Sequence, residues 1–270
     1  MYRSGGRRSM TETSGTARTF AILDLFLRST DSLTLSAVSE LTGLPRPTAH
    51  RYLKDLVSWG GLDKTADGRY RVGPKMWMLG SVSDWERSIR QESRPLVSAL
   101  AQGLHQAVAL TTLHQSKIVC VDRAWGSTPS IYLVQPGEEV PLPPSSAGRI
   151  LLSGLAEPQL SGAFKELDET CAARVSCNSY TGTPTPVYDS EKLRTMVDEA
   201  RDKGFSIAAG ELRPGQTSLS VLVNVPRMEV NLALSLLTPT CKEVSAVNFL
   251  PYLKDAAAVL AKKLGRLSRQ

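Results

Sequence analysis

Apolar residues in the first third of the chain recur at helical spacing. The pattern is clearest in residues 46–58, where four apolar side chains follow the i, i+3, i+4 and i+7 positions of one buried helix face. Weaker patterns of the same kind predict helices over 17–28 and 35–42. A tight turn at Gly43 separates the last two helices, and two short helices joined in this way are typical of a helix-turn-helix. The apolar positions expected to pack are Phe20, Ile22, Leu23, Phe26, Leu27, Val38, Leu41, Ala49, Tyr52, Leu53 and Leu56.

Residues 62–72 carry the pattern of a β-hairpin. An Asp-Gly pair stands between two short extended runs, and this pair is among the strongest hairpin signals. Because side chains alternate along a strand, we expect Tyr70 and Val72 to face the core and Arg69 and Arg71 to face the other way. Three helices followed by a hairpin with two outward arginines predict a winged helix-turn-helix.

Residues 74–91 predict a further helix. Its apolar residues Met78, Val82, Trp85 and Ile89 fall at i, i+4, i+7 and i+11 and form one stripe. This stripe is too apolar for a free linker. It fits either the chain's own hairpin or a second copy of the chain, and we favour the second copy.

The rest of the chain alternates strand and helix patterns without an internal repeat. This order indicates an antiparallel sheet covered by helices, and hence an α+β fold class. A segment rich in Thr, Ser, Cys and Pro at 168–186 predicts a long loop, and such loops are often functional. The expected elements are strands at 107–113, 118–121, 131–134, 217–225 and 230–237 and helices at 145–155, 157–166, 193–203 and 247–267.

The length of 270 residues and the apolar fraction of 41% agree with two globular domains. We divide the chain into a flexible tail at 1–15, a winged helix-turn-helix at 16–74, a linker helix at 75–91 and a second domain at 92–270. No apolar run is long enough for a membrane helix, and the N-terminus shows no secretory signal. We therefore expect a cytoplasmic protein without a membrane partner.

The net charge of +6 is concentrated at one end of the chain. Residues 1–90 hold 14 Lys and Arg against 9 Asp and Glu, whereas the remaining residues hold 18 against 17. A basic excess confined to a small helical domain is expected for nucleic-acid binding, although a solvated basic face has the same composition.

Nothing in the sequence predicts a metal, a cofactor or a catalytic residue. The four cysteines, Cys120, Cys171, Cys177 and Cys241, form no CxxC pair and have no histidine near them in sequence. Reduced structural thiols are the expectation, and only Cys171 and Cys177 leave a redox sensor open. The chain contains no GxSxG, Walker, HExxH or GxGxxG motif.

Three sequence blocks resemble the IclR (isocitrate lyase regulator) family. They read LTGLPRPTAHRYLKDLVSWGGLDKTADGRYRVGPKMWMLG at 41–80, PLPPSSAGRILLS at 141–153 and, in a degraded form, GFSIAAGELRPG at 204–215. The resemblance runs from about residue 16 to the C-terminus. It implies a transcription regulator with an N-terminal winged helix-turn-helix, a linker helix and a GAF-like effector domain. Such proteins act as dimers or tetramers on palindromic operators.

The polar side of helix 46–58 suits double-stranded DNA. An arginine can make a bidentate contact with guanine, whereas Thr and His can reach bases or phosphates. The hairpin arginines suit the narrow minor groove or its phosphates. Surface solubility is the alternative role for each of these residues. The residues expected to contact DNA are Arg46, Thr48, His50, Arg51, Lys54, Arg69 and Arg71.

The turn at 145–148 opens a short helix whose free N–H groups and positive dipole end favour an anion. The resemblance implies that effector atoms lie against this turn and the later strands. Family members often carry an acidic residue where this chain has Ala208, a Cys at Ser218 and a hydroxyl at Leu237. We therefore expect a less polar pocket for a larger, partly apolar organic acid, aromatic acids included. The effector-binding residues so implied are Ser146, Ala147, Gly148, Ala208, Ser218, Ser235 and Leu237.

These observations favour a DNA-binding transcriptional regulator whose operator binding responds to a small organic acid. Two alternatives stay open. The second domain could be an enzyme with the winged helix as an accessory, or the chain could serve a protein interaction through the same basic face. Small packing side chains are the alternative role of Ser218 and Ser235.

Overall fold

A computed structural model describes eight stretches of the 270-residue chain, which divides into two compact units, Met1–Asp84 and Trp85–Gln270. Residues 1–13 of the predicted tail at 1–15 and most of the predicted loop at 168–186 lie outside the described residues, and Gly15 begins the first helix. Within the described part, no helix combines the length and apolarity that a membrane span requires. The described residues are 14–27, 32–82, 84–114, 117–128, 134–172, 189–225, 230–239 and 246–267.

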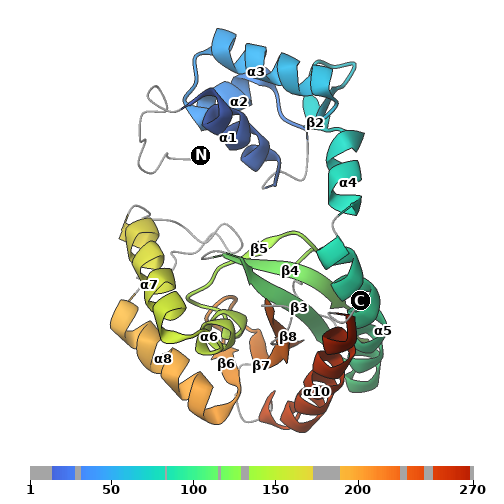
Figure 1. The fold of residues 1–270 in the computed structure, drawn as a ribbon, viewed down its shortest axis with the longest axis vertical. Coiled ribbons are helices and arrows are strands. Elements are labelled where there is room, and N and C mark those ends of the chain that lie inside the picture. The colour runs from blue at the N-terminus through green and yellow to red at the C-terminus, as the bar shows by residue number, and fades with distance from the viewer. Residues whose placement is uncertain are drawn as a thin grey trace. The chain divides into compact units, whose positions relative to one another are not determined.

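The first unit contains the predicted helices and hairpin (Figure 1). Helix α2 begins where the Thr34 hydroxyl accepts a hydrogen bond from the Ala37 amide, at 3.2 Å. It ends at Gly43, whose φ of 70° is in the left-handed region that favours glycine. The elements are α1 (Gly15–Leu27), α2 (Leu35–Thr42), α3 (Arg46–Trp59), β1 (Leu62–Lys64), β2 (Tyr70–Val72) and α4 (Pro74–Ser81).

The core of the first unit is smaller than the hydrophobic pattern predicts. On α1 it is centred on Ile22 and Phe26, which are one turn apart. Phe20 lies 200° around the helix from Ile22, and it is 60% exposed. Leu27 is exposed for a similar reason. The prediction that both pack in the core was therefore wrong.

Two further positions differ from the predicted core. On α2 the buried residues are Val38 and Thr42, one turn apart, so Leu41 points to solvent. On β2 Tyr70 is buried but Val72 is 51% exposed. The hairpin strands are only three residues long, and Val72 is the last residue of β2.

The segment predicted as one helix over 74–91 forms parts of two helices. Helix α4 ends at Ser81, and α5 (Asp84–Leu104) continues well past residue 91. Met78 and Val82 are exposed, whereas Ile89 is fully buried in the core of the second unit. The predicted stripe is therefore not a continuous face.

The second unit is built on a six-stranded antiparallel sheet with the strand order β5-β4-β3-β8-β7-β6. The sheet confirms the predicted α+β class. Besides α5, its elements are β3 (Ala107–His114), β4 (Lys117–Ala124), β5 (Glu139–Val140), α6 (Ser146–Ser153), α7 (Glu157–Ala172), α8 (Ser190–Lys203), β6 (Ser206–Ala209), β7 (Thr217–Val225), β8 (Val230–Thr238) and α10 (Leu250–Leu267).

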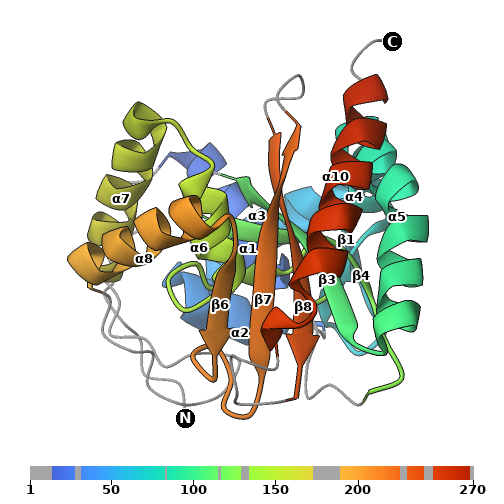
Figure 2. The ribbon, with the colours of Figure 1, turned by 90° about the horizontal axis from the view of Figure 1, so that it is seen from below.

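Helices cover both faces of this sheet. Figure 2 shows α6, α7 and α8 on one side and α5 and α10 on the other, and each side has its own apolar cluster. Along β7, which corresponds to the strand predicted at 217–225, apolar residues alternate. Leu219, Val221, Val223 and Val225 pack toward α5 and α10, because successive side chains point to opposite faces.

Two strands at the edges of the sheet were not predicted. Both β5 and β6 are short, with two and four residues. The strand predicted at 131–134 falls mostly outside the described residues, and Val134 itself is buried without belonging to a strand. Helix α7 runs to Ala172 and so includes the first five residues of the segment predicted as a loop.

Candidate DNA-binding and effector sites

Helix α3 separates its apolar and polar sides clearly. Ala49, Leu53 and Leu56 are buried against the other helices. Because residues three and four apart share a face, the positions between them point outward. Of the residues predicted to contact DNA, four are exposed on α3 and Thr48 is half-buried. The exposed four are Arg46, His50, Arg51 and Lys54.

Arg46 occupies a position that does not favour its charge. It is the first residue of α3, preceded by Pro45, which makes no side-chain cap, and the first turn contains no acidic residue. The N-terminal end of a helix carries partial positive charge, so a guanidinium there is repelled by the helix dipole. The guanidinium and the N-terminal end of the helix would both attract a phosphate. An arginine at this position therefore favours binding of an anionic partner, although it does not stabilise the helix.

The two hairpin arginines have different surroundings. Arg69 is half-buried and donates from Nε to the Ser32 hydroxyl at 2.7 Å and from Nη2 to the Ser32 carbonyl at 2.5 Å. Arg71 is exposed and lies 3.6 Å from the Asp63 carboxylate on the paired strand. Arg69 therefore ties the hairpin to the segment before α2, whereas Arg71 keeps the more open guanidinium.

The predicted anion-binding turn is buried and tightly packed. The Ser145 hydroxyl caps α6 by accepting from the Gly148 amide at 3.1 Å. A Cβ on Gly148 would lie 2.2 Å from the Leu142 carbonyl oxygen, so only glycine fits this close approach. All eight residues of α6, Ser146 and Ala147 included, are buried.

Sheet register places the predicted strand residues next to each other. Ala208, Ser218 and Leu237 are paired across β6, β7 and β8, and Ser235 faces Ser220 in the adjoining row. Residues two apart on a strand point to the same face. The side chains in the two rows are mostly small, and the Ser218–Ser146 contact places this patch beneath the start of α6.

Hydroxyl groups join the helix to this patch. The Ser146 hydroxyl donates to that of Ser218 at 2.7 Å and lies 2.7 Å from that of Ser220. Ser220 is in turn 2.7 Å from Ser235. Ser146, Ser218 and Ser235 were predicted from the sequence, whereas Ser220 was missed. A buried chain of hydroxyls can both accept and donate hydrogen bonds, as recognition of a carboxyl group requires.

A buried cation also stands near this patch and was not predicted. Arg149 on α6 has a side chain only 5% exposed, and it pairs with Glu211. It also donates to the Ile207 carbonyl at 3.0 Å, while its Nε has no hydrogen-bond partner in the described structure. Arg149 thus anchors α6 to the edge strand β6, beside Ala208.

Cys120 lies on the same side of the sheet, but its thiol is poorly reactive. It belongs to the apolar cluster under α6, and burial raises the pKa of its thiol to about 12. Such a thiol is not ionised near neutral pH and is a poor nucleophile and metal ligand. The described residues also contain no group of three His, Cys, Asp or Glu side chains placed to share a metal ion.

Both units match known protein families. Residues 15–65 match the IclR helix-turn-helix domain, and residues 85–262 match the bacterial transcriptional regulator IclR C-terminal domain. The second match alone covers more than half of the chain. The chain belongs to the IclR family. The resemblance noted from the three sequence blocks is therefore confirmed, as is the combination of a helix-turn-helix with a C-terminal effector domain.

Full-length relatives of this IclR chain carry regulatory names. It is 26% identical over 251 residues to the HTH-type transcriptional regulator XynR of Escherichia coli, covering 92% of this chain and 96% of the relative. It is 26% identical over 253 residues to the Pca regulon regulatory protein of Pseudomonas putida, with coverages of 92% and 83%.

A solved IclR structure has the same fold. It is an IclR homolog of Microbacterium hydrocarbonoxydans, complexed with 4-hydroxybenzoate, which aligns at a TM-score of 0.75 and 24% identity. The alignment covers 93% of this chain and 99% of the other. This likeness supports the architecture of both units.

Proposed function

We propose that this IclR-family regulator reads double-stranded DNA with α3 and the hairpin, and that a small organic acid bound beneath α6 changes its affinity for that DNA. The observation that carries the DNA-binding part is α3. It exposes Arg46, His50, Arg51 and Lys54, whereas its buried residues are all apolar. This pattern combines base-reading and phosphate-binding groups on one helix, as a recognition helix needs. The site of action is then the cytoplasm.

The effector part rests on the hydroxyl chain and its small neighbours. Ser146, Ser218 and Ser235 offer donors and acceptors for a carboxylate, and Ala208 and Leu237 make part of the surroundings apolar. A partly apolar acid fits this mixture better than a small polar acid does. The IclR homolog solved with 4-hydroxybenzoate supports an aromatic acid as the class to test first.

The oligomeric part rests on α4. None of its residues is buried, and Trp77 is 74% exposed, with Met78 and Leu79, and Val82 just after the helix, also open to solvent. An apolar surface of this kind is typical of a contact with another chain. A homodimer, or a tetramer made from two of them, would present two α3 helices to the half-sites of a palindromic operator.

Regulation then follows from unequal affinities. The acid can shift DNA binding only if it binds the DNA-competent and incompetent arrangements of the protein differently. By the same linkage, operator DNA changes the affinity for the acid by an equal factor. A regulator therefore shows this reciprocal change in affinity and leaves the acid unchanged, whereas an enzyme would consume the acid.

The test is a fluorescence-anisotropy titration of the full chain on the DNA upstream of its own gene. It includes a scrambled duplex, two salt concentrations and a panel of aliphatic and aromatic acids. We expect preference for the natural sequence and a steep loss of affinity with salt, since several phosphate contacts release counterions. One aromatic acid should change the affinity and be recovered unaltered.

Two variants locate the effector response. Ser218→Ala removes a hydroxyl from the chain beneath α6, whereas Ser161→Ala removes an exposed hydroxyl from α7. We expect the first to raise the acid concentration needed for a half-maximal response about tenfold, and the second to leave it unchanged. Salt-insensitive binding would favour the protein-interaction alternative, and conversion of the acid would favour the enzyme.

A further inference from the structure

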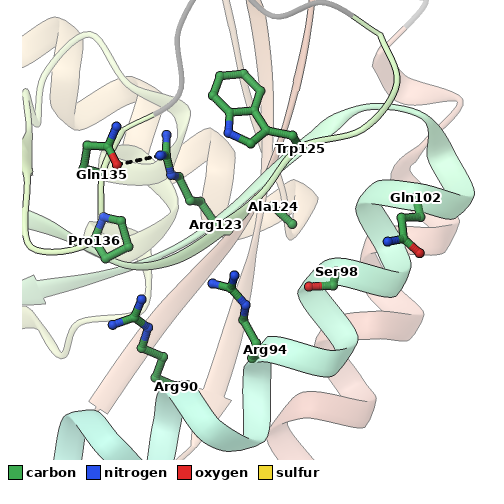
Figure 3. A pocket seen from close by; sticks show the side chains of 9 residues that line it. All are labelled: Arg90, Arg94, Ser98, Gln102, Arg123, Ala124, Trp125, Gln135 and Pro136. Carbon is green, nitrogen blue, oxygen red and sulfur yellow. Dashed lines mark hydrogen bonds between the residues drawn. The ribbon is translucent and has the colours of Figure 1, made fainter.

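A cavity of about 430 Å³ lies between α5 and the end of β4 (Figure 3). It belongs wholly to the second unit, and none of the residues predicted to bind an effector lines it. The serine chain faces α6, whereas α5 covers the other side of the sheet. The cavity is therefore separate from the effector site proposed above.

Helix α5 supplies one wall through its own periodicity. Arg90, Arg94, Ser98 and Gln102 are spaced four residues apart, which keeps them near one face of the helix. Figure 3 shows Arg90 and Arg94 extending toward the opposite wall, which carries Arg123. The helix thus presents two guanidinium groups followed by two neutral polar groups.

The lining is positively charged. Three of its residues are arginines and none is acidic. Beneath the lining, the fully buried Asp122 accepts a hydrogen bond from Arg94 at 2.6 Å, and Arg90 Nε lies 3.8 Å from the same oxygen. One carboxylate therefore fixes Arg94 and only partly balances Arg90. Since a guanidinium has several donors in a planar fork, both arginines keep N–H groups that could bind a second anion.

The opposite wall adds a flat apolar group. The Arg123 guanidinium lies 5.4 Å from the centre of the Trp125 ring and donates to Gln135 Oε1 at 2.5 Å. Trp125 remains 47% exposed. An exposed indole beside a cationic cavity offers both area and a π face to a planar molecule, and covering it removes apolar surface from water.

We propose that this cavity binds a planar organic anion, an aromatic carboxylate, at a second site of the effector domain. Arg90 and Arg94 hold the carboxylate, and the ring lies against Trp125. The volume falls within the range of about 300–1,000 Å³ that is usual for small-molecule sites. The proposal does not depend on DNA binding or on the serine chain.

Isothermal titration calorimetry of the full chain without DNA tests this site, with benzoate, acetate and inorganic phosphate as probes. Arg90→Gln/Arg123→Gln removes two charges from the lining while leaving the Arg94–Asp122 pair intact. Lys165→Gln/Lys192→Gln removes two exposed charges from α7 and α8 and is the matched control. Thermal melting of each variant verifies that it is folded.

We expect benzoate to bind the unmodified chain more tightly than acetate or phosphate does. The arginine variant should weaken this binding about tenfold or more, because the carboxylate loses its contact with Arg90 and the lining loses a second positive charge at Arg123. Trp125→Ala should weaken it several-fold, whereas the lysine control should not.

Other results overturn the proposal. Benzoate binding that is unchanged in the arginine variant, or that is lost only in Ser218→Ala, would place the anion elsewhere. Absence of benzoate binding at millimolar concentration would mean that the cavity is not a site for aromatic carboxylates. Phosphate binding as tight as benzoate binding, with no effect of Trp125→Ala, would remove the aromatic ligand from the proposal.

Discussion

The candidate functional residues are mostly exposed in the first unit and mostly buried in the second. In the first unit, the residues expected to contact DNA lie mostly on the surface of a small core. In the second unit, the residues expected to contact an effector lie in α6 or on the strands beneath it, and both Ser146 and its neighbour Ser220 are fully buried. Exposed groups can be exchanged without disturbing the fold, whereas buried polar groups are part of it. Binding and stability should therefore separate under mutation in the first unit and stay linked in the second.

The largest expected effect comes from the small core of the first unit. Leu53 is fully buried on α3, and Leu53→Ala should lower the free energy of unfolding of this unit by about 2–5 kcal/mol. Because the core contains few residues, DNA binding should fail at moderate temperature. Thermal melting followed by circular dichroism, together with a DNA titration, measures both effects.

The matched substitution is Leu41→Ala on the neighbouring helix. Leu41 is 56% exposed, so its loss should change the stability by no more than about 0.5 kcal/mol. Equal destabilisation by the two variants would show that the core extends further than Ile22, Val38 and Leu53 indicate.

A smaller effect, confined to binding, is expected for Arg46→Ala. The variant should weaken binding to the operator and to a scrambled duplex by a similar factor and reduce the salt slope by about 1, as the loss of one phosphate contact does. Its melting temperature should stay the same or rise slightly, since the change removes a positive charge from the N-terminal end of α3. DNA titrations and melting curves of the same preparation check both expectations.

Lys192→Ala serves as the control for charge, because Lys192 is an exposed cation on α8. It should leave DNA affinity unchanged. If Arg46→Ala lowered the melting temperature as well as the DNA affinity, DNA binding and stability would not be separable in the first unit.

In the second unit, Ser220→Ala should reduce stability by about 1 kcal/mol. The hydroxyls of Ser146 and Ser235 would each lose a partner in a buried position. The response to the acid should fall in the same variant, because the hydroxyl chain is interrupted. Denaturant unfolding and an acid titration on the DNA complex measure the two quantities. Loss of one without the other would contradict the expected linkage.

The smallest effect is an absence of reaction at Cys120. With Cys171, Cys177 and Cys241 replaced by serine, the native chain should not react with a disulfide reagent at pH 8. Burial keeps the pKa of the Cys120 thiol near 12, well above that pH. Reaction should occur after denaturation. A fast native reaction would mean that the cluster under α6 opens readily.

Features set by local chemistry were predictable from the sequence. Thr34 and Ser145 begin helices because their hydroxyls accept from nearby amides, and Gly43 and Gly204 end helices because they adopt positive φ. The alternation along β7 likewise indicates that Leu219, Val221 and Val223 share one face. These signals lie within a few residues of the structures that they specify.

Features set by long-range pairing were not predictable in the same way. Ser220 joins the hydroxyl chain only because β7 is paired with β8 in one particular register. Phe20 and Leu27 match a helical pattern, but packing against the other helices selected Ile22 and Phe26 instead. Arg90 and Arg123 are far apart in sequence and meet at one cavity through the placement of α5.

The complete burial of α6 also has a consequence for its backbone amides. Because no residue of Ser146–Ser153 is open to solvent, these amides can exchange hydrogen with water only when the helix separates from the sheet. Their exchange rates measure how often the serine chain opens. A molecule bound at this turn would slow that exchange, so the rate of deuterium uptake by α6 would report occupancy of the site to mass spectrometry.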